Sequence, residues 1–147
     1  MVALLGLSIK LPFKKYPRPN GGFDQFAVVS INISLPGKNA PRSKRFEAII
    51  DSGACRCTFH SGIGKAIGLE VDKGEVEETY GVSGEPTTVH LHDIHLHAPG
   101  GIIPIRAAFT EKLPVAAILG MDGFFNHFRV TFDPTAQRCD LERIYQA

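Results

Sequence analysis

Short apolar stretches that alternate with polar residues recur along the whole chain, and glycines and prolines separate them at close intervals. Alternation with a period of two is typical of half-buried strands, and this punctuation is typical of the turns between strands. The clearest example is residues 26–35, where valine, isoleucine and leucine alternate with serine and asparagine. The pattern predicts an all-β fold with strands over residues 2–11, 26–35, 45–50, 75–80, 85–91, 90–97, 102–109, 115–119, 128–132 and 138–142.

Two short segments, residues 61–68 and 122–127, are predicted to be helical. Ser61 is a possible N-cap of the first helix and Gly68 its terminator, and Asp122 suits the N-cap or first turn of the second. A loop is predicted over residues 14–22 and a turn over residues 36–43, because glycine, proline and charged residues gather there. The number of strands suits a small closed sheet.

Length and composition narrow the class of protein. With 147 residues and 44% hydrophobic content, the chain is expected to be one domain over residues 1–147. The net charge of +1 argues against charge-driven binding to nucleic acid or to an anionic membrane. Residues 1–9 are apolar but have no preceding basic region and are too short to span a bilayer, so we expect a strand there. Three cysteines without a secretory signal favour reduced thiols and a cytoplasmic protein.

The candidate chemistry lies in the tetrapeptide Asp51-Ser52-Gly53-Ala54, which directly follows the apolar strand at residues 46–50. A carboxylate that leaves the end of a buried strand in a tight turn is well placed for acid/base chemistry. Asp, Ser and Gly are also the ordinary residues of turns, so the tetrapeptide alone fits a plain surface turn better. A second apolar run, Ile118-Leu119-Gly120, ends in glycine near the C-terminus.

Together, and in this order, these two segments resemble the retropepsin-like aspartic proteases. The resemblance covers about residues 45–141 and leaves the first 25 residues unmatched. It implies a closed acid-protease-like β barrel with a flap hairpin and one or two short helices. It assigns the catalytic carboxylate to Asp51. It implies supporting roles for the rest of the turn and for the core beneath it, namely Ser52, Gly53, Ala54, Ile118, Leu119 and Gly120.

A glycine-containing loop lies between the strands predicted at residues 75–80 and 85–91, and glycine can supply the positive φ angles that a hairpin tip needs. By resemblance, this hairpin is the flap that closes over an extended peptide and bonds to its backbone. A plain surface hairpin would have the same sequence pattern. The expected flap and substrate-binding residues are Tyr80, Gly81, Val82, Ser83 and Gly84.

Aspartic protease chemistry needs two neighbouring carboxylates, and this chain has one matching aspartate. The resemblance therefore implies a homodimeric endopeptidase in which two copies of Asp51 activate water, with no metal or other cofactor. Its other partner would be an extended peptide or protein substrate, and residues 138–144 are candidate dimer contacts. Asp122 lacks the Asp-(Ser/Thr)-Gly pattern of a second catalytic carboxylate. The alternative is a catalytically idle module with the same fold that binds a peptide or protein without cutting it.

Two further groups of residues could carry chemistry. His90 and His92 are expected on one face of a strand, and Asp93, His95 and His97 on the other, so no face collects four metal ligands without a bend. We prefer histidines facing solvent or a neighbouring strand, and a metal-binding β protein is the third hypothesis. Two cysteines after the turn are expected to share a strand face as small buried hydrophobes, with an oxidation-sensitive pair as the alternative. These are Cys55 and Cys57.

Overall fold

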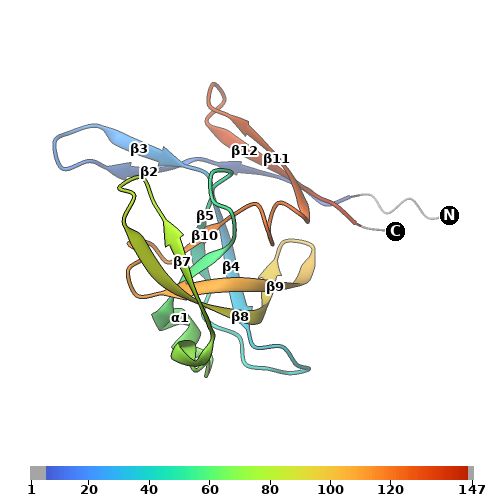
Figure 1. The fold of residues 1–147 in the computed structure, drawn as a ribbon. Helices are drawn as coiled ribbons and strands as arrows, with labels where there is room; N and C mark the ends of the chain where they lie inside the picture. Colours follow the sequence, from blue (N-terminus) through green and yellow to red (C-terminus); the bar gives the residue numbers. More distant parts are fainter. Residues whose placement is uncertain (1–5, 146–147) are drawn as a thin grey trace.

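The computed structural model describes residues 6–145, which form mostly β-strands (Figure 1). A three-stranded antiparallel sheet joins the two ends of the chain: β12 (Arg138–Arg143) lies between β1 (Ser8–Pro12) and β11 (Phe128–Asp133). The first part of the strand predicted over residues 2–11 falls outside the described residues. Among the described residues, no helix is long and apolar enough to cross a membrane.

Six strands close into a barrel, which confirms the predicted closed β fold. The ring closes because β8 pairs at its far end with β4, where Asn32 lies opposite His97 and Ser34 opposite His95. β7 (Glu75–Tyr80) pairs with β8 outside the ring. In order around the ring, the strands are β4 (Val28–Ser34), β5 (Phe46–Ile50), β10 (Ala117–Leu119), β6 (Thr58–His60), β9 (Gly101–Thr110) and β8 (Pro86–Ala98).

The core of the barrel is filled by aliphatic and aromatic side chains that point inward from alternate strand positions. Phe59 of β6 stacks on Phe109 of β9 with ring centroids 5.7 Å apart, and both are fully buried. Full burial of an aromatic side chain contributes roughly 1.5–3 kcal/mol. β6 has only three residues, too few for a pattern of alternation, so the sequence did not predict it.

The loop predicted over residues 14–22 is wrong in its first part. β2 (Lys14–Pro17) and β3 (Phe23–Phe26) form an antiparallel hairpin that ends just before β4. Gly21 and Gly22, at φ +92° and +80°, turn the chain between the two strands. Tyr16 packs edge-on against Phe26 with ring centroids 5.5 Å apart, and this contact stabilises the pairing of β2 with β3. The sequence predicted a loop instead because prolines and glycines are frequent in this segment.

The first predicted helix is present as α1 (Ser61–Ala66), and Gly68 ends it at φ +89°, as expected. The predicted N-cap, Ser61, is wrong. Ser61 is buried, and the Nδ1 atom of His60 accepts the hydrogen bond from the Gly62 amide at 3.0 Å. A short 3-10 helix, η1 (Val71–Lys73), follows and leads into β7.

The second predicted helix, over residues 122–127, is wrong. These residues form a series of turns, because Gly123 has φ +112° and a right-handed helix cannot contain that angle. The capping role predicted for Asp122 is therefore also wrong. Instead, the Asn126 side chain accepts a hydrogen bond from the Gly123 amide at 2.7 Å, and Phe124 is buried in the core.

Candidate active site

A groove of about 640 Å³ lies between the turn that follows β5 and the hairpin of β7 and β8. Asp51, Gly53 and Ala54 line it from the turn. Tyr80 and Gly81 line it from the hairpin. Two of the sequence-predicted groups, the catalytic turn and the flap, are therefore brought together on opposite walls of one groove.

Backbone hydrogen bonds hold Asp51 at the end of β5. Its amide donates to the Leu119 carbonyl oxygen at 2.9 Å, and its own carbonyl oxygen accepts from the Ala54 amide at 3.2 Å. The Oδ1 atom of its side chain accepts from the Gly53 amide at 2.8 Å. Asp51 is half-buried, so its carboxylate is oriented by the turn yet remains accessible from the groove.

The segment expected to support this turn contains β10, which lies beside β5. It runs parallel to β5, with Leu119 opposite Ile50, and Leu119 is fully buried. A Cβ atom at Gly120 would lie 2.6 Å from the Ala54 carbonyl oxygen and closer still to that of Arg56. Only glycine fits there without a shift of the backbone. Ile118, which was expected in the core beneath the turn, is half-buried and lines the groove.

The predicted hairpin is confirmed as a structure. β7 and β8 pair in antiparallel fashion up to Tyr80 opposite Pro86, and the Gly84 amide donates to the Gly81 carbonyl oxygen at 3.0 Å. Gly84 has φ +76°, the angle for which glycine was expected. Val82 is fully exposed at the tip. The predicted tip residues Val82, Ser83 and Gly84 do not line the groove, so in this conformation the tip stands away from it.

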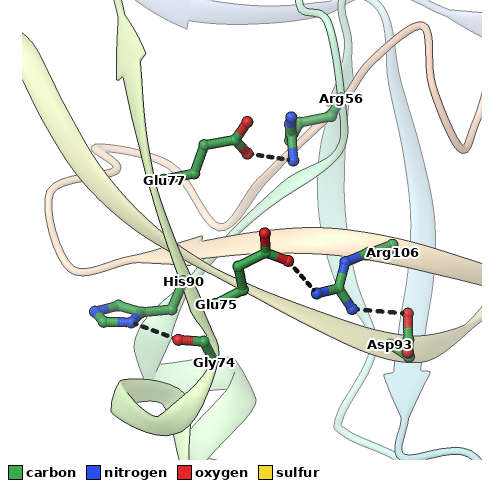
Figure 2. A network of polar contacts seen from close by, with 7 residues as sticks. All are labelled: Arg56, Gly74, Glu75, Glu77, His90, Asp93 and Arg106. Carbon is green, nitrogen blue, oxygen red and sulfur yellow. Dashed lines mark hydrogen bonds and ion pairs between the residues drawn. The ribbon is translucent and has the colours of Figure 1, made fainter.

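Charged side chains also line the groove, which the sequence analysis did not predict. Arg56 lies five residues after Asp51, and its Nη1 atom is 2.7 Å from the Oε2 atom of Glu77 on β7 (Figure 2). Glu78 and Lys112 also line the groove. The alternation of acidic residues along β7 was a visible signal, but their basic partners come from distant parts of the chain.

The base of β7 is held by a second set of ion pairs. Arg106 of β9 bonds to Glu75 at 2.7 Å through Nη2 and to Asp93 of β8 at 3.2 Å through Nη1 (Figure 2). These hydrogen bonds raise the pKa of the Arg106 guanidinium above its ordinary value. Asp93 is exposed and points to this arginine, so its predicted separation from His90 and His92 holds.

The apolar part of the groove comes from β8, β9 and the segments around β10. Val89 and Ala108 belong to a small buried cluster with Leu91 that is separate from the main core. Val89, Ala108, Leu113 and Ile118 all line the groove. Such a surface suits the apolar side chains of a ligand that lies along the strands.

Three histidines of β8 lie close to backbone or hydroxyl oxygens. The Nε2 atom of His92 lies 2.8 Å from the Val71 carbonyl oxygen, and Nε2 of His97 lies 2.8 Å from the Ser34 hydroxyl. His90 approaches the Gly74 carbonyl oxygen at 3.5 Å. Within residues 6–145, no group of three or more His, Cys, Asp or Glu side chains is arranged to hold a metal ion.

The shared strand face predicted for Cys55 and Cys57 is wrong. Residues 55–57 precede β6, and their backbone turns so that Cys55 is exposed in the groove while Cys57 is fully buried below it. Burial raises the pKa of the Cys57 thiol to about 11. Asp122 is exposed and does not line the groove.

Comparison with known proteins supports the fold. No family model matches the sequence, and no curated protein matches it. A solved structure described as a retropepsin-like aspartic protease from Rickettsia conorii superposes with a TM-score of 0.60 at 15% sequence identity. The match covers 97% of this chain and 98% of that chain, so it extends well beyond residues 45–141. The chain therefore has the fold of the retropepsin-like aspartic proteases.

Proposed function

We propose that the protein is an aspartic endopeptidase that acts as a homodimer. The observation that carries this proposal is the position of Asp51. Its carboxylate stands at the end of a buried strand, is oriented by the Gly53 amide, and faces a groove bounded by a glycine-tipped hairpin. The sequence resemblance assigns water activation to a carboxylate in this turn, and the shared retropepsin-like fold supports that assignment.

The second carboxylate would come from a second copy of the chain. Among the described residues, Asp51 is the one aspartate that lines the groove, and two facing carboxylates are needed so that one is ionised while the other keeps a proton. A two-fold axis near Asp51 would bring the two copies together in an isologous dimer. Ser52 is exposed beside Asp51, which leaves its hydroxyl free to bond across such an axis.

The terminal sheet limits how a dimer could form. β12 covers most of residues 138–144, the sequence-based candidates for dimer contacts, but both of its edges are already paired, with β1 and with β11. Its backbone therefore cannot accept another strand. If the dimer extends this sheet, the available edges are those of β1 and β11.

The reaction would proceed by attack of water on the peptide carbonyl carbon. The ionised Asp51 takes a proton from the water as the water oxygen bonds to the carbonyl carbon, and the protonated Asp51 of the second copy transfers its proton to the carbonyl oxygen. This gives a gem-diol. As the C–N bond breaks, the first Asp51 gives its new proton to the nitrogen, which leaves as an amine, and one gem-diol hydroxyl returns a proton to the second Asp51, so the dyad is again singly protonated.

The substrate would be an extended segment of peptide or protein. Its backbone would pair with the hairpin and with the walls of the groove, as an added strand does. Val89, Ala108 and Ile118 would contact its apolar side chains.

We also propose a reducing, cytoplasmic setting for the protein. Cys55, Cys57 and Cys139 are all free thiols, and the last two are buried. The described fold therefore does not depend on a disulfide, in keeping with a reducing compartment.

The test is digestion of a peptide library, read by mass spectrometry, at several pH values and at protein concentrations that favour dimers. Asp51→Asn and Asp51→Ala are both expected to abolish cleavage. Circular dichroism should stay unchanged in Asp51→Asn, because its side-chain oxygen can still accept the hydrogen bond from the Gly53 amide, which Asp51→Ala loses. Asp122→Asn is the matched control, since it changes an exposed aspartate outside the groove and should leave cleavage intact.

Two outcomes would contradict the proposal. Cleavage that persists in a clean preparation of Asp51→Asn would exclude this mechanism. If the wild type cuts nothing but retains peptides, the protein is instead a binding module with this fold.

A further inference from the structure

The hairpin strand β7 is an edge strand whose backbone pairs, among the described strands, with β8 alone. Its residues are mostly exposed, and its tip is fully exposed at Val82. A strand with one neighbour and little apolar burial opens more easily than the strands of a barrel. Something other than packing must therefore hold β7 against the groove.

Two acidic side chains on β7 make that connection. Glu75 and Glu77 are two residues apart, so they point to the same side of the strand. Each meets an arginine from another part of the fold: Glu75 contacts Arg106 near the base, and Glu77 contacts Arg56 at the groove (Figure 2). The second contact is closer to the exposed tip at Val82.

Arg56 is a firm anchor because its own backbone is fixed on both sides. Arg56 forms a parallel β-bridge with Asp122, and the Asp122 amide donates to the Cys55 carbonyl oxygen at 2.9 Å. On the other side, the Ala108 amide donates to the Cys57 carbonyl oxygen at 3.0 Å. The guanidinium thus projects into the groove from the segment that also carries the Asp51 turn.

The contact itself is an ion pair with restricted access to water. Nη1 of Arg56 lies 2.7 Å from Oε2 of Glu77, at angles that do not make a hydrogen bond, and that carboxylate oxygen is enclosed by protein. The two side chains are 34% and 43% exposed. The enclosed oxygen depends on Arg56 for compensation of its charge, so loss of the arginine favours movement of β7 away from the groove.

We propose that Arg56 is a positioning residue that holds β7 over the groove through Glu77 and so sets the affinity for substrate. This inference rests on the proposed protease function for its kinetic part. Its structural part, the restraint of β7, stands apart from any activity. A peptide bound under the hairpin gains backbone bonds only while β7 stays in place, so the ion pair acts on substrate binding more than on the chemical step.

The first test measures hydrogen exchange of the backbone amides of residues 75–80 in the protein without substrate. Arg56→Gln and Glu77→Gln are each expected to speed this exchange by about two- to fivefold, the range that partly exposed ion pairs support. Arg129→Gln is the matched control, because it removes an exposed ion pair, 3.3 Å to Glu142, between β11 and β12 of the terminal sheet, and neither residue lines the groove. Unchanged exchange in both test variants would overturn the proposal.

The second test compares cleavage kinetics. Arg56→Gln and Glu77→Gln should raise KM by a similar two- to fivefold with kcat nearly unchanged, Arg56→Lys should stay close to wild type, and the double variant Arg56→Glu/Glu77→Arg should recover part of the loss. A fall in kcat with constant KM, or no recovery in the double variant, would overturn the proposal. If the wild type cleaves nothing, the protease function fails and the exchange measurement alone decides the role of Arg56.

Discussion

The two walls of the groove are held in different ways. The turn at Asp51 is fixed by backbone hydrogen bonds to Leu119 and Ala54 and rests on β10, in which Ala117 and Leu119 are fully buried. In the hairpin opposite, β7 pairs with one strand, β8, and is restrained by ion pairs between exposed or half-exposed side chains. The first kind of restraint changes little with solvent conditions, whereas the second weakens with salt and with the loss of a single charge.

This difference matches what each wall would have to do. A carboxylate that activates water must keep its geometry to within a fraction of an ångström, so it belongs on a rigid element. A hairpin that admits a peptide and then covers it must open and close, so it needs restraints of modest strength. The following experiments test that contrast, beginning with the largest expected effect.

Cysteine labelling should distinguish the groove surface from the layer directly beneath it. With iodoacetamide at pH 8, the folded protein should react at Cys55 at least about a hundredfold faster than at Cys57. Cys57 is fully buried, and with its pKa raised to about 11 only about one thiol in a thousand is ionised at that pH. Peptide mapping would measure both rates, with protein in guanidinium chloride as the control. Equal rates in the folded protein would mean that the turn is not rigid.

Glycine substitutions in the two walls should change the free energy of unfolding by different amounts. Gly120→Ala places a Cβ against the Ala54 and Arg56 carbonyl oxygens and should lower the free energy of unfolding by about 3 kcal/mol. Gly81→Ala, the matched control in the hairpin, meets no atom within 4 Å and should change it by less than about 0.5 kcal/mol. Urea denaturation would measure both. If both substitutions lower the free energy of unfolding by a similar amount, the two walls do not differ in rigidity.

The smallest expected effect is a change of stability with pH. It concerns His97 of β8, whose ring lies 2.8 Å from the Ser34 hydroxyl of β4 where these two strands close the barrel. Burial, followed by the charges of Arg42 and His95, lowers the pKa of His97. The folded state therefore binds the proton more weakly than the unfolded state. The resulting stability is present in full above the ordinary pKa of 6.5 and is lost as pH falls through the lowered value.

Urea unfolding at pH 7.5 and at pH 5.5 would measure this loss. His97→Gln should reduce it, because Gln can still bond to the Ser34 hydroxyl but does not titrate in this range. Burial also lowers the pKa of His127, which would account for part of the stability that His97→Gln still loses between the two pH values. If His97→Gln loses as much stability as the wild type, His97 does not couple protonation to folding.

Local patterns in the sequence predicted the strand framework and most of the candidate site. Alternation located the strands at residues 46–50 and 128–132 closely, because one face of each contacts the core and the side-chain period of a strand is two. The strand at residues 75–80 is mostly exposed, and the glycine-containing loop after it marked its end. The hairpin at Gly81 to Gly84 was predictable because its glycine supplies a positive φ angle. The strand at 58–60 was too short for any pattern, and the helix at 122–127 failed because Gly123 adopts φ +112°.

The sequence by itself determined the elements whose cause is local: strand alternation, the glycine turns, and a carboxylate in a tight turn after an apolar strand. Only the tertiary structure decided which distant groups meet. Leu119 lies beside Asp51 because β10 pairs with β5, and Arg56 reaches Glu77 because β7 folds back over the groove. The physical reason is that these contacts join residues 21 to 68 positions apart, and their geometry depends on how the whole barrel closes.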